Sequence, residues 1–204
     1  MSGKIEKYTF TFDVESDWGG RANSYNGVKV GIPKILSALS AYDIKGLFFV
    51  STEILRECRN EIYMIKESGH EIGSHGHFHI KYDKSWRASQ DRGISEILLE
   101  TFRRKGQAKF KYRAPKFSWI DKDEPYSNPK NHIGLLKYMW FGGRINKDTI
   151  FYIHPFDIVG GSNPPNLFCR LWYSKPEDAY ETFINWLKWD SRSHTANKTL
   201  QKVT

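Results

Sequence analysis

The chain has 204 residues, of which 39% are hydrophobic, 15% aromatic and 26% charged. This composition is typical of a globular domain and excludes collagen, coiled coils and disordered chains. No apolar run approaches the roughly 20 residues of a membrane span, and two cysteines cannot form a disulfide framework. The net charge of +8 favours an acidic partner, whether nucleic acid, an anionic lipid or an anionic glycan.

The first part of the chain alternates predicted strands and helices. Residues 7–13 alternate apolar and polar side chains and are rich in threonine and aromatics, which predicts a strand that ends at an acid. Residues 28–42 carry apolar side chains at helical spacing. Residues 46–50 form a continuous apolar run, as in a strand buried on both faces. A second helix follows this strand and ends near residue 69, where a glycine interrupts it.

The rest of the chain continues the alternation. The predicted elements are a strand at 71–74, a helix at 89–104, strands at 110–112 and 150–153, and a closing helix at 177–189 before a polar tail from about residue 191. Such alternation predicts a parallel sheet covered by helices, either an open doubly wound sheet or a small barrel. We therefore expect a single α/β domain over residues 1–204, with its function at the carboxyl ends of the strands.

Four residues with suitable chemistry fall at or just after these strand ends. They are Asp13, His75, Arg113 and His154. Arg113 lies between a strand end and Pro115, where it is well placed to pair with Asp13. An arginine in that position would keep the carboxylate ionised, because an opposite charge lowers the pKa of an acid.

Residues 11–18 contain three carboxylates spaced two residues apart, Asp13, Glu15 and Asp17. In an extended chain all three would share one face. Like charges this close repel one another unless a cation or an arginine joins them. On this pattern alone, the segment could be either a metal site or a solvated acidic loop.

Three of the seven histidines, His75, His77 and His79, lie within five residues. Imidazole is the commonest metal ligand in proteins, so this clustering favours a metal site. On a helical turn His75 and His79 would share a face, whereas on a strand all three would. Two imidazoles and one carboxylate form the three-ligand set of a hydrolytic site, which keeps an open position for water.

The order of these motifs resembles that of polysaccharide deacetylases of the NodB-homology type, carbohydrate esterase family four. The matching segments are Thr11-Phe12-Asp13-Val14-Glu15 for the family's Thr-Phe-Asp-Asp, Gly69 through His79 for Gly-His-Glu-Ile-Gly and His-x-x-x-His, Arg113-Ala114-Pro115 for Arg-x-Pro, and Tyr152-Ile153-His154-Pro155 for the late hydrophobic-x-His motif. The agreement runs from about Tyr8 to Asp157. It implies a distorted (β/α) barrel with parallel strands, trimmed because only 41 positions separate residue 113 from residue 154.

The resemblance implies a metal-dependent hydrolase that removes an N-acetyl group from an amino sugar or a polysaccharide precursor. In this chain the implied metal ligands are Glu15, His75 and His79, with Asp17 as the alternative to Glu15. The implied cation is zinc, and cobalt or nickel are alternatives.

The resemblance also implies an acid–base pair, in which Asp13 takes a proton from water, Arg113 supports Asp13, and His154 protonates the departing amine. Two departures from the family pattern affect these roles. Val14 replaces the usual second aspartate, and the family's fourth motif, which tunes the catalytic histidine, has no match. Asp157, three residues after His154, is one source of the missing negative charge.

Two other functions remain open. Non-sugar C–N hydrolases, allantoinase-like or deformylase-like, share these motifs, and a carbohydrate-binding module that lost turnover would keep the fold. Intact Asp13 and His154 argue against a module that only binds. The expected partner is a carbohydrate bearing N-acetyl groups, with no nucleic acid because the basic residues are scattered. A peripheral membrane contact and the oligomeric state stay open, and the lack of a signal-peptide core favours the cytoplasm.

The remaining histidines and aromatics have plainer interpretations. We expect His77 to lie beside the ligands rather than among them, and His70 to be an ordinary surface or packing residue. His132 and His194 have no surrounding constellation. Core packing and stacking on sugar rings are equally open for the aromatic residues Trp18, Phe117, Trp119, Trp140 and Trp172.

Overall fold

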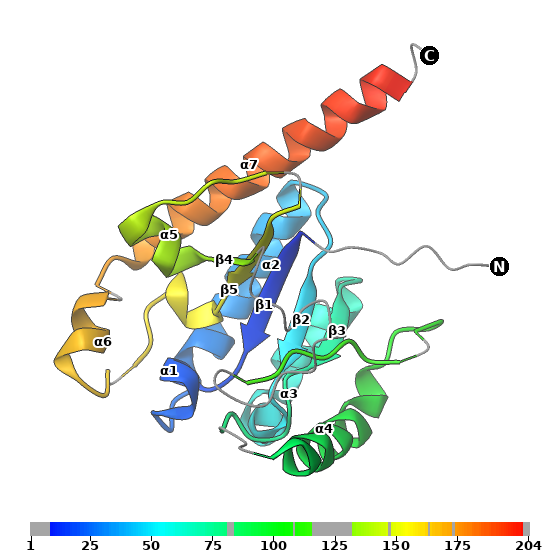
Figure 1. Cartoon of the computed structure of the whole chain (residues 1–204), viewed down its shortest axis with the longest axis vertical. Helices are drawn as coiled ribbons and strands as arrows, with labels where there is room; N and C mark the ends of the chain where they lie inside the picture. Colours follow the sequence, from blue (N-terminus) through cyan, green and yellow to red (C-terminus); the bar gives the residue numbers. More distant parts are fainter. Residues whose placement is uncertain are drawn as a thin grey trace.

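The computed structural model describes residues 9–80, 84–107, 109–115, 132–146, 148–162, 164–172 and 174–201. Within these residues, five parallel strands form one sheet in the order β3-β2-β1-β5-β4 (Figure 1). The strands are β1 (Phe10–Val14), β2 (Leu47–Val50), β3 (Glu71–Ser74), β4 (His132–Gly134) and β5 (Ile150–Ile153). Because all five run in one direction, their carboxyl ends meet along one edge of the sheet.

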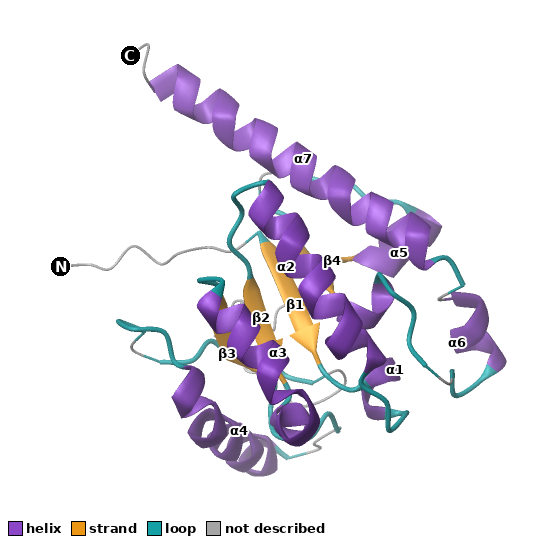
Figure 2. Cartoon of the chain, turned by 180° about the vertical axis from the view of Figure 1, so that it is seen from behind, coloured by secondary structure: helices purple, strands orange, loops and turns teal. Residues whose placement is uncertain are grey.

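Helices pack against this sheet, and α2, α3 and α7 lie on one face of it (Figure 2). The helices are α1 (Asp17–Gly20), α2 (Ile32–Ala41), α3 (Leu55–Glu67), α4 (Ser85–Leu99), α5 (Leu135–Phe141), α6 (Leu167–Trp172) and α7 (Pro176–Gln201). Short 3-10 turns lie at Thr52–Ile54, Glu100–Phe102 and Pro155–Asp157, and a π-helical turn at Gly27–Gly31 precedes α2. Among the described helices, none has the length and apolar character to cross a bilayer.

The side chains of β1 divide between two faces of the sheet, and this division positions the site. Phe12 points into the main core, where it stacks on Phe48 with ring centroids 4.5 Å apart and meets Phe183 of α7 edge-on at 6.0 Å. Truncating a buried phenylalanine of this kind costs about 3–5 kcal/mol, so this layer holds β1 firmly in place. Successive side chains of a strand point to opposite faces, so Thr11 and Asp13 are directed to the other face.

The parallel α/β architecture expected from the sequence is confirmed. Several individual elements differ from those predicted. Residues 110–112 form no full strand, and Tyr112 instead makes one parallel bridge to Ser74. The helix predicted at 89–104 is α4, and the closing helix is α7, so the expected polar tail continues as helix to Gln201. The sequence does not predict α1, β4, α5 or α6, because each is too short for its periodicity to stand out.

Candidate metal centre and active site

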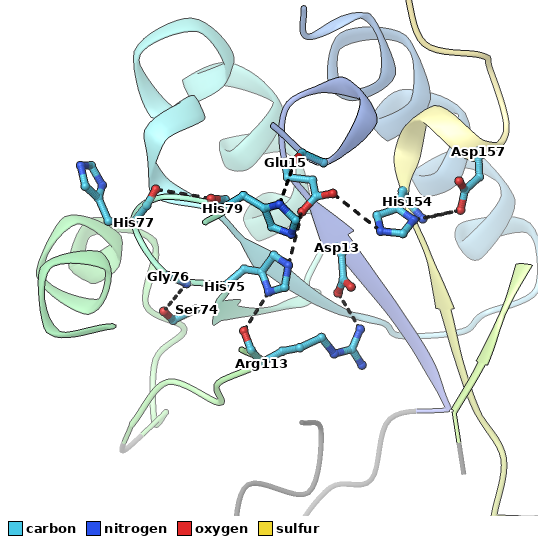
Figure 3. A network of polar contacts seen from close by, with 12 residues as sticks. Asp13, Glu15, Ser74, His75, Gly76, His77, His79, Arg113, His154 and Asp157 are labelled. Atoms are coloured by element: carbon cyan, nitrogen blue, oxygen red, sulfur yellow. Dashed lines mark hydrogen bonds and ion pairs between the residues drawn. The ribbon is translucent and has the colours of Figure 1, made fainter. Parts of the chain in front are cut away.

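The carboxyl ends of β1, β3 and β5 bring the expected site residues together (Figure 3). Asp13 lies in β1 and Glu15 directly follows that strand. His75 directly follows β3, and His79 lies four residues further along the same loop. His154 directly follows β5. They meet because β1 lies between β2 and β5 in the sheet, with β3 next to β2.

Glu15, His75 and His79 converge on a single point. The Glu15 Oε2 atom lies 2.7 Å from Nε2 of His79 and 3.4 Å from Nε2 of His75. One ligand atom from each residue can be chosen so that all three lie within 4.8 Å of one another. Glu15 and His75 are buried and His79 is nearly so, since its side chain is only 12% exposed.

Hydrogen bonds on the far side of each imidazole decide which nitrogen faces Glu15. The Nδ1 atom of His75 lies 2.8 Å from the carbonyl oxygen of Arg113, and Nδ1 of His79 lies 3.0 Å from that of Gly19. A carbonyl oxygen can only accept, so both Nδ1 atoms carry a proton and donate it. In a neutral imidazole, Nε2 then presents a lone pair to the carboxylate.

Three lone pairs therefore meet at Glu15 Oε2, which is buried and makes no hydrogen bond. A positive charge must lie among them, either as a proton on an imidazole or as a metal ion. Burial raises the pKa of Glu15, but the positive charges of protonated His79 and His154 outweigh burial and lower the pKa, so this residue is a carboxylate. Two imidazole nitrogens supported by backbone carbonyls and one carboxylate oxygen fit a divalent metal such as zinc.

Asp13 is held by Arg113 on the face of the sheet opposite the main core. Arg113 Nη1 donates to Asp13 Oδ1 at 2.5 Å, and Nη2 donates to the Thr11 hydroxyl at 2.8 Å. Burial raises the pKa of Asp13, but the Arg113 guanidinium, with His75 and His154, outweighs it and lowers the pKa. Arg113 thus supports Asp13 through its side chain and His75 through its backbone carbonyl.

His154 lies on the other side of Glu15 and has an acidic partner of its own. Its Nε2 atom is 3.7 Å from Glu15 Oε1, and its Nδ1 atom is 3.3 Å from Oδ2 of Asp157. The same Asp157 oxygen accepts the backbone N–H of His154 at 2.8 Å. Burial lowers the pKa of His154, but Asp157, Glu15 and Asp13 outweigh it and raise the pKa to about 9. The imidazole is therefore protonated at neutral pH.

Two residues considered from the sequence lie outside this cluster. His77 points away from it (Figure 3), and its Nδ1 atom lies 2.9 Å from the Thr52 hydroxyl. Asp17 is fully buried, and its carboxylate accepts hydrogen bonds from Gly27 N–H at 2.9 Å, from the Ser24 hydroxyl at 2.7 Å and from a third donor. These bonds occupy the carboxylate that was the alternative to Glu15.

Two further histidines, His70 and His132, lie outside the proposed ligand set. His70 is buried, accepts the Gly46 N–H at 3.1 Å and packs on Phe48, which is a packing role. His132, for which no constellation was expected, lies within electrostatic reach of Arg113 and Asp13. Burial and Arg113 lower its pKa to about 4, so it is neutral. No sequence signal indicates this position, because the strand that carries His132 has three residues.

The aromatic residues that could stack on a sugar are only partly described. Trp18 is buried, and its indole N–H donates to the Ser162 carbonyl at 2.8 Å, which makes it a core residue. Trp140 is 49% exposed. Phe117 and Trp119 lie outside the described residues, as do the side chains of Trp172 and His194.

Solved structures with a similar fold come from carbohydrate esterases. A family 4 carbohydrate esterase from Bacillus anthracis is 16% identical to this chain, with a TM-score of 0.55. The match covers 92% of this chain and 76% of the esterase. A family 4 acetyl xylan esterase from Clostridium thermocellum, in complex with a cobalt ion, is 17% identical to this chain, with a TM-score of 0.55. The match covers 90% of this chain and 84% of that esterase. At these identities the likeness shows the fold.

The similar structures also include a protein described as a pseudoenzyme. This CE4 family pseudoenzyme from Bacillus anthracis is 17% identical with a TM-score of 0.53, and the match covers 88% of this chain. The chain spans 61% of the length of that protein. A search of curated proteins finds no match.

The comparison with family models agrees with the motifs. The model for polysaccharide deacetylase matches residues 4–117, which is more than half of the chain. The matched range includes the acidic cluster, the loop with the paired imidazoles and Arg113, whereas His154 follows it. The chain belongs to the polysaccharide deacetylase family.

Proposed function

We propose that this chain is a metal-dependent deacetylase that hydrolyses an N-acetyl group on an amino sugar or a polysaccharide precursor. The observation that carries the proposal is the convergence of Glu15 with the Nε2 atoms of His75 and His79. A carboxylate suited to act as a base and an imidazolium suited to act as an acid lie beside this cluster. A site that only bound sugar would need neither of them.

Glu15, His75 and His79 would hold the divalent cation. When bound, such a cation polarises the acetamide carbonyl and makes water a better nucleophile at neutral pH. Zinc suits the two nitrogen donors and one oxygen donor, and cobalt or nickel suit them as alternatives. One family 4 esterase of similar fold is in complex with cobalt, which supports including cobalt in the test.

Asp13 acts as the general base. Its lowered pKa keeps it ionised, and Arg113 fixes one of its oxygens, which leaves the other to accept a proton. As a water oxygen forms a bond to the acetyl carbon, Asp13 takes the proton that the water loses. The Arg113 guanidinium is held in turn by Thr11, so that the carboxylate keeps one orientation.

His154 acts as the general acid. Its side chain is 23% exposed, which gives a substrate access to the ring. As the C–N bond breaks, His154 gives its proton to the amine nitrogen, which leaves as the free amino sugar while the acetyl group leaves as acetate. Asp157 keeps the ring protonated and oriented beforehand, in place of the acidic residue of the family's fourth motif.

The test is acetate release by the purified chain, after removal of metal and reconstitution with zinc, cobalt or nickel. Acetylated chitooligosaccharides and peptidoglycan fragments represent the proposed substrates, because a peptidoglycan N-acetylglucosamine deacetylase is among the proteins of similar fold. We expect metal-dependent acetate release, abolished by a chelator and restored by the metal. D13N is the control that separates this activity from a contaminant.

Other outcomes separate the alternatives. Turnover of a cyclic ureide or a formamide, with no release of acetate from sugars, would assign the site to a non-sugar C–N hydrolase. Tight binding of metal and sugar without any turnover would instead indicate a binding module. Both outcomes would contradict the proposal.

A further inference from the structure

The loop that carries both candidate imidazoles is hydrogen-bonded along both sides of its backbone. On one side its carbonyl oxygens accept hydrogen bonds from the turn that follows β2. The N–H of Thr52 donates to the Gly76 carbonyl at 3.0 Å, and the N–H of Glu53 donates to the His77 carbonyl at 2.9 Å. The Ser51 hydroxyl also donates to the His77 carbonyl, at 3.4 Å.

On the other side, a carboxylate from α4 holds the amides of the loop. Oδ2 of Asp91 accepts the N–H of His77 at 2.8 Å, and Oδ1 accepts the N–H of Phe78 at 3.1 Å. Asp91 is only 5% exposed. Burying a carboxylate is costly unless it is well hydrogen-bonded. The two N–H groups of the loop supply hydrogen bonds that solvent would otherwise provide to Asp91.

Gly76 provides the room that this carboxylate needs. Its φ angle is +84°, in the left-handed region that favours glycine, and a Cβ atom there would lie 2.4 Å from Asp91 Oδ2. One turn further along α4, Ser95 accepts a hydrogen bond from the Ser74 hydroxyl at 2.9 Å. Helix α4 therefore contacts the loop both just before the first imidazole and between the two.

We propose that Asp91 is a positioning residue for the metal centre. By holding the amides of His77 and Phe78, it sets the spacing and direction of the flanking His75 and His79, whose ring centroids lie 5.2 Å apart. Both Nε2 atoms then approach the same carboxylate oxygen. The inference rests on the proposed metal function, and Asp91 acts through the backbone between the two ligands.

The test compares zinc affinity and metal-free stability in the wild-type chain and in D91N. Asparagine keeps one acceptor but turns an NH₂ group toward the second amide, so the loop loses one of its two anchors. We expect the Kd for zinc, measured by competition with a chelating dye, to rise about 10- to 100-fold, as for other residues that support metal ligands. Excess zinc should restore turnover, which a general loss of structure would not allow.

E96Q is the matched control, because it also converts a carboxylate of α4 to an amide. Glu96 pairs with Arg92 on the same helix at 2.8 Å and is partly exposed, and such pairs contribute little to stability. We expect its Kd for zinc to stay that of the wild type. A D91N chain that binds zinc as tightly as wild type, whatever its Tm in EDTA, would overturn the role of Asp91. If the wild type binds no zinc, the proposed function fails instead.

A measurement on the unaltered chain covers the case in which D91N does not fold. In metal-free wild-type protein, the amides of His77 and Phe78 should exchange slowly with deuterium, because Asp91 already holds them. If they exchange as fast as an open loop and become protected only when zinc is added, the metal orders the loop. That result would remove Asp91 from the positioning of the site.

Discussion

Asp13 and Glu15 are two residues apart, yet their neighbours give them different chemistry. Asp13 faces a guanidinium, which keeps it ionised and leaves an oxygen available for a proton. Glu15 faces the Nε2 atoms of two imidazoles, and that arrangement needs a positive charge, which the proposed metal ion would supply. Single substitutions can therefore separate the loss of proton transfer from the loss of metal.

Asp13→Asn should lower turnover by about 10²- to 10⁴-fold, the contribution typical of general acid–base catalysis. Its metal content should stay that of the wild type, because Asp13 is bonded to Arg113 rather than to the imidazoles. Glu15→Gln should lower the metal content first, since it removes the anionic donor of the cluster. Acetate release and metal analysis after dialysis measure the two effects. The reverse pattern would mean that base and ligand are exchanged.

The pH dependence of the rate should report His154. A general acid works while it is protonated, and a pKa raised to about 9 keeps His154 protonated up to that pH. The rate should therefore fall as pH rises through about 9. Asp157→Asn removes the carboxylate at 3.3 Å, so this basic limb should move toward lower pH, in the direction of the free imidazole value near 6.5.

The matched variant for this profile is His154→Ala, in which the basic limb should disappear along with most of the turnover. Profiles of kcat/KM against pH for the three chains make the measurement. An Asp157→Asn profile with its limb unmoved would show that other groups raise the pKa of His154. A His154→Ala chain with near-normal turnover would remove this histidine from the mechanism.

At the level of secondary-structure elements, the segment after β1 is tied to the segment after β5. The Asp17 carboxylate accepts hydrogen bonds from the N–H groups of Gly27 and Ser162 and from the Ser24 hydroxyl. Trp18, in a left-handed conformation with φ of 64°, donates its indole N–H to the Ser162 carbonyl. One buried carboxylate thus joins the segment that carries Glu15 to the segment that follows His154, the proposed general acid.

Asp17→Asn should destabilise the fold without removing a ligand. Hydrogen bonds to a charged group contribute about 1.5–3 kcal/mol each, and asparagine keeps only one acceptor, so we expect a loss of about 2–4 kcal/mol. For a chain of this length that lowers Tm by about 5–15 °C in calorimetry. Asp178→Asn is the control, because Asp178 is exposed and only pairs with Lys175 at 3.6 Å. Equal Tm values for the two variants would contradict this role of Asp17.

At the level of the whole molecule, one face of the sheet carries the aromatic core and the other carries charge. The first face packs beneath α2, α3 and α7 (Figure 2). The other face holds the Asp13–Arg113 pair beside a small apolar cluster of Leu47, Phe49 and Ile150. Glu15, His75 and His79, the proposed metal ligands, follow the carboxyl ends of β1 and β3, so metal binding there would be coupled to the fold as a whole.

Zinc should therefore raise the stability of the whole chain. Binding to the folded state at 100 times Kd adds about 2.7 kcal/mol, which raises Tm by about 5–10 °C for a chain of this length. Calorimetry in EDTA and in excess zinc gives the difference. His79→Ala should lose most of the shift because it removes one of three ligands. A wild-type Tm that is the same in EDTA and in zinc would contradict a metal centre here.

The sequence by itself determined the class of fold and the family. Apolar periodicity predicts strands and helices because it reflects which face of each element is buried, a local property. The strand ends then indicated Asp13, His75 and His154, since parallel strands place their carboxyl ends at one edge. The cytoplasmic location and the extent of the domain stay predictions from the sequence.

Only the tertiary structure decided how these residues are paired. Arg113 reaches Asp13 across 100 positions of chain, and no local pattern states whether Glu15 or Asp17 meets the imidazoles. The carboxylate of Asp17 accepts hydrogen bonds from distant backbone groups, whereas that of Glu15 points at His75 and His79. From the sequence we expect the Asp13–Arg113 pair, and the family resemblance favours Glu15 over Asp17. The contacts themselves depend on how distant elements pack together, which periodicity and motif order do not describe.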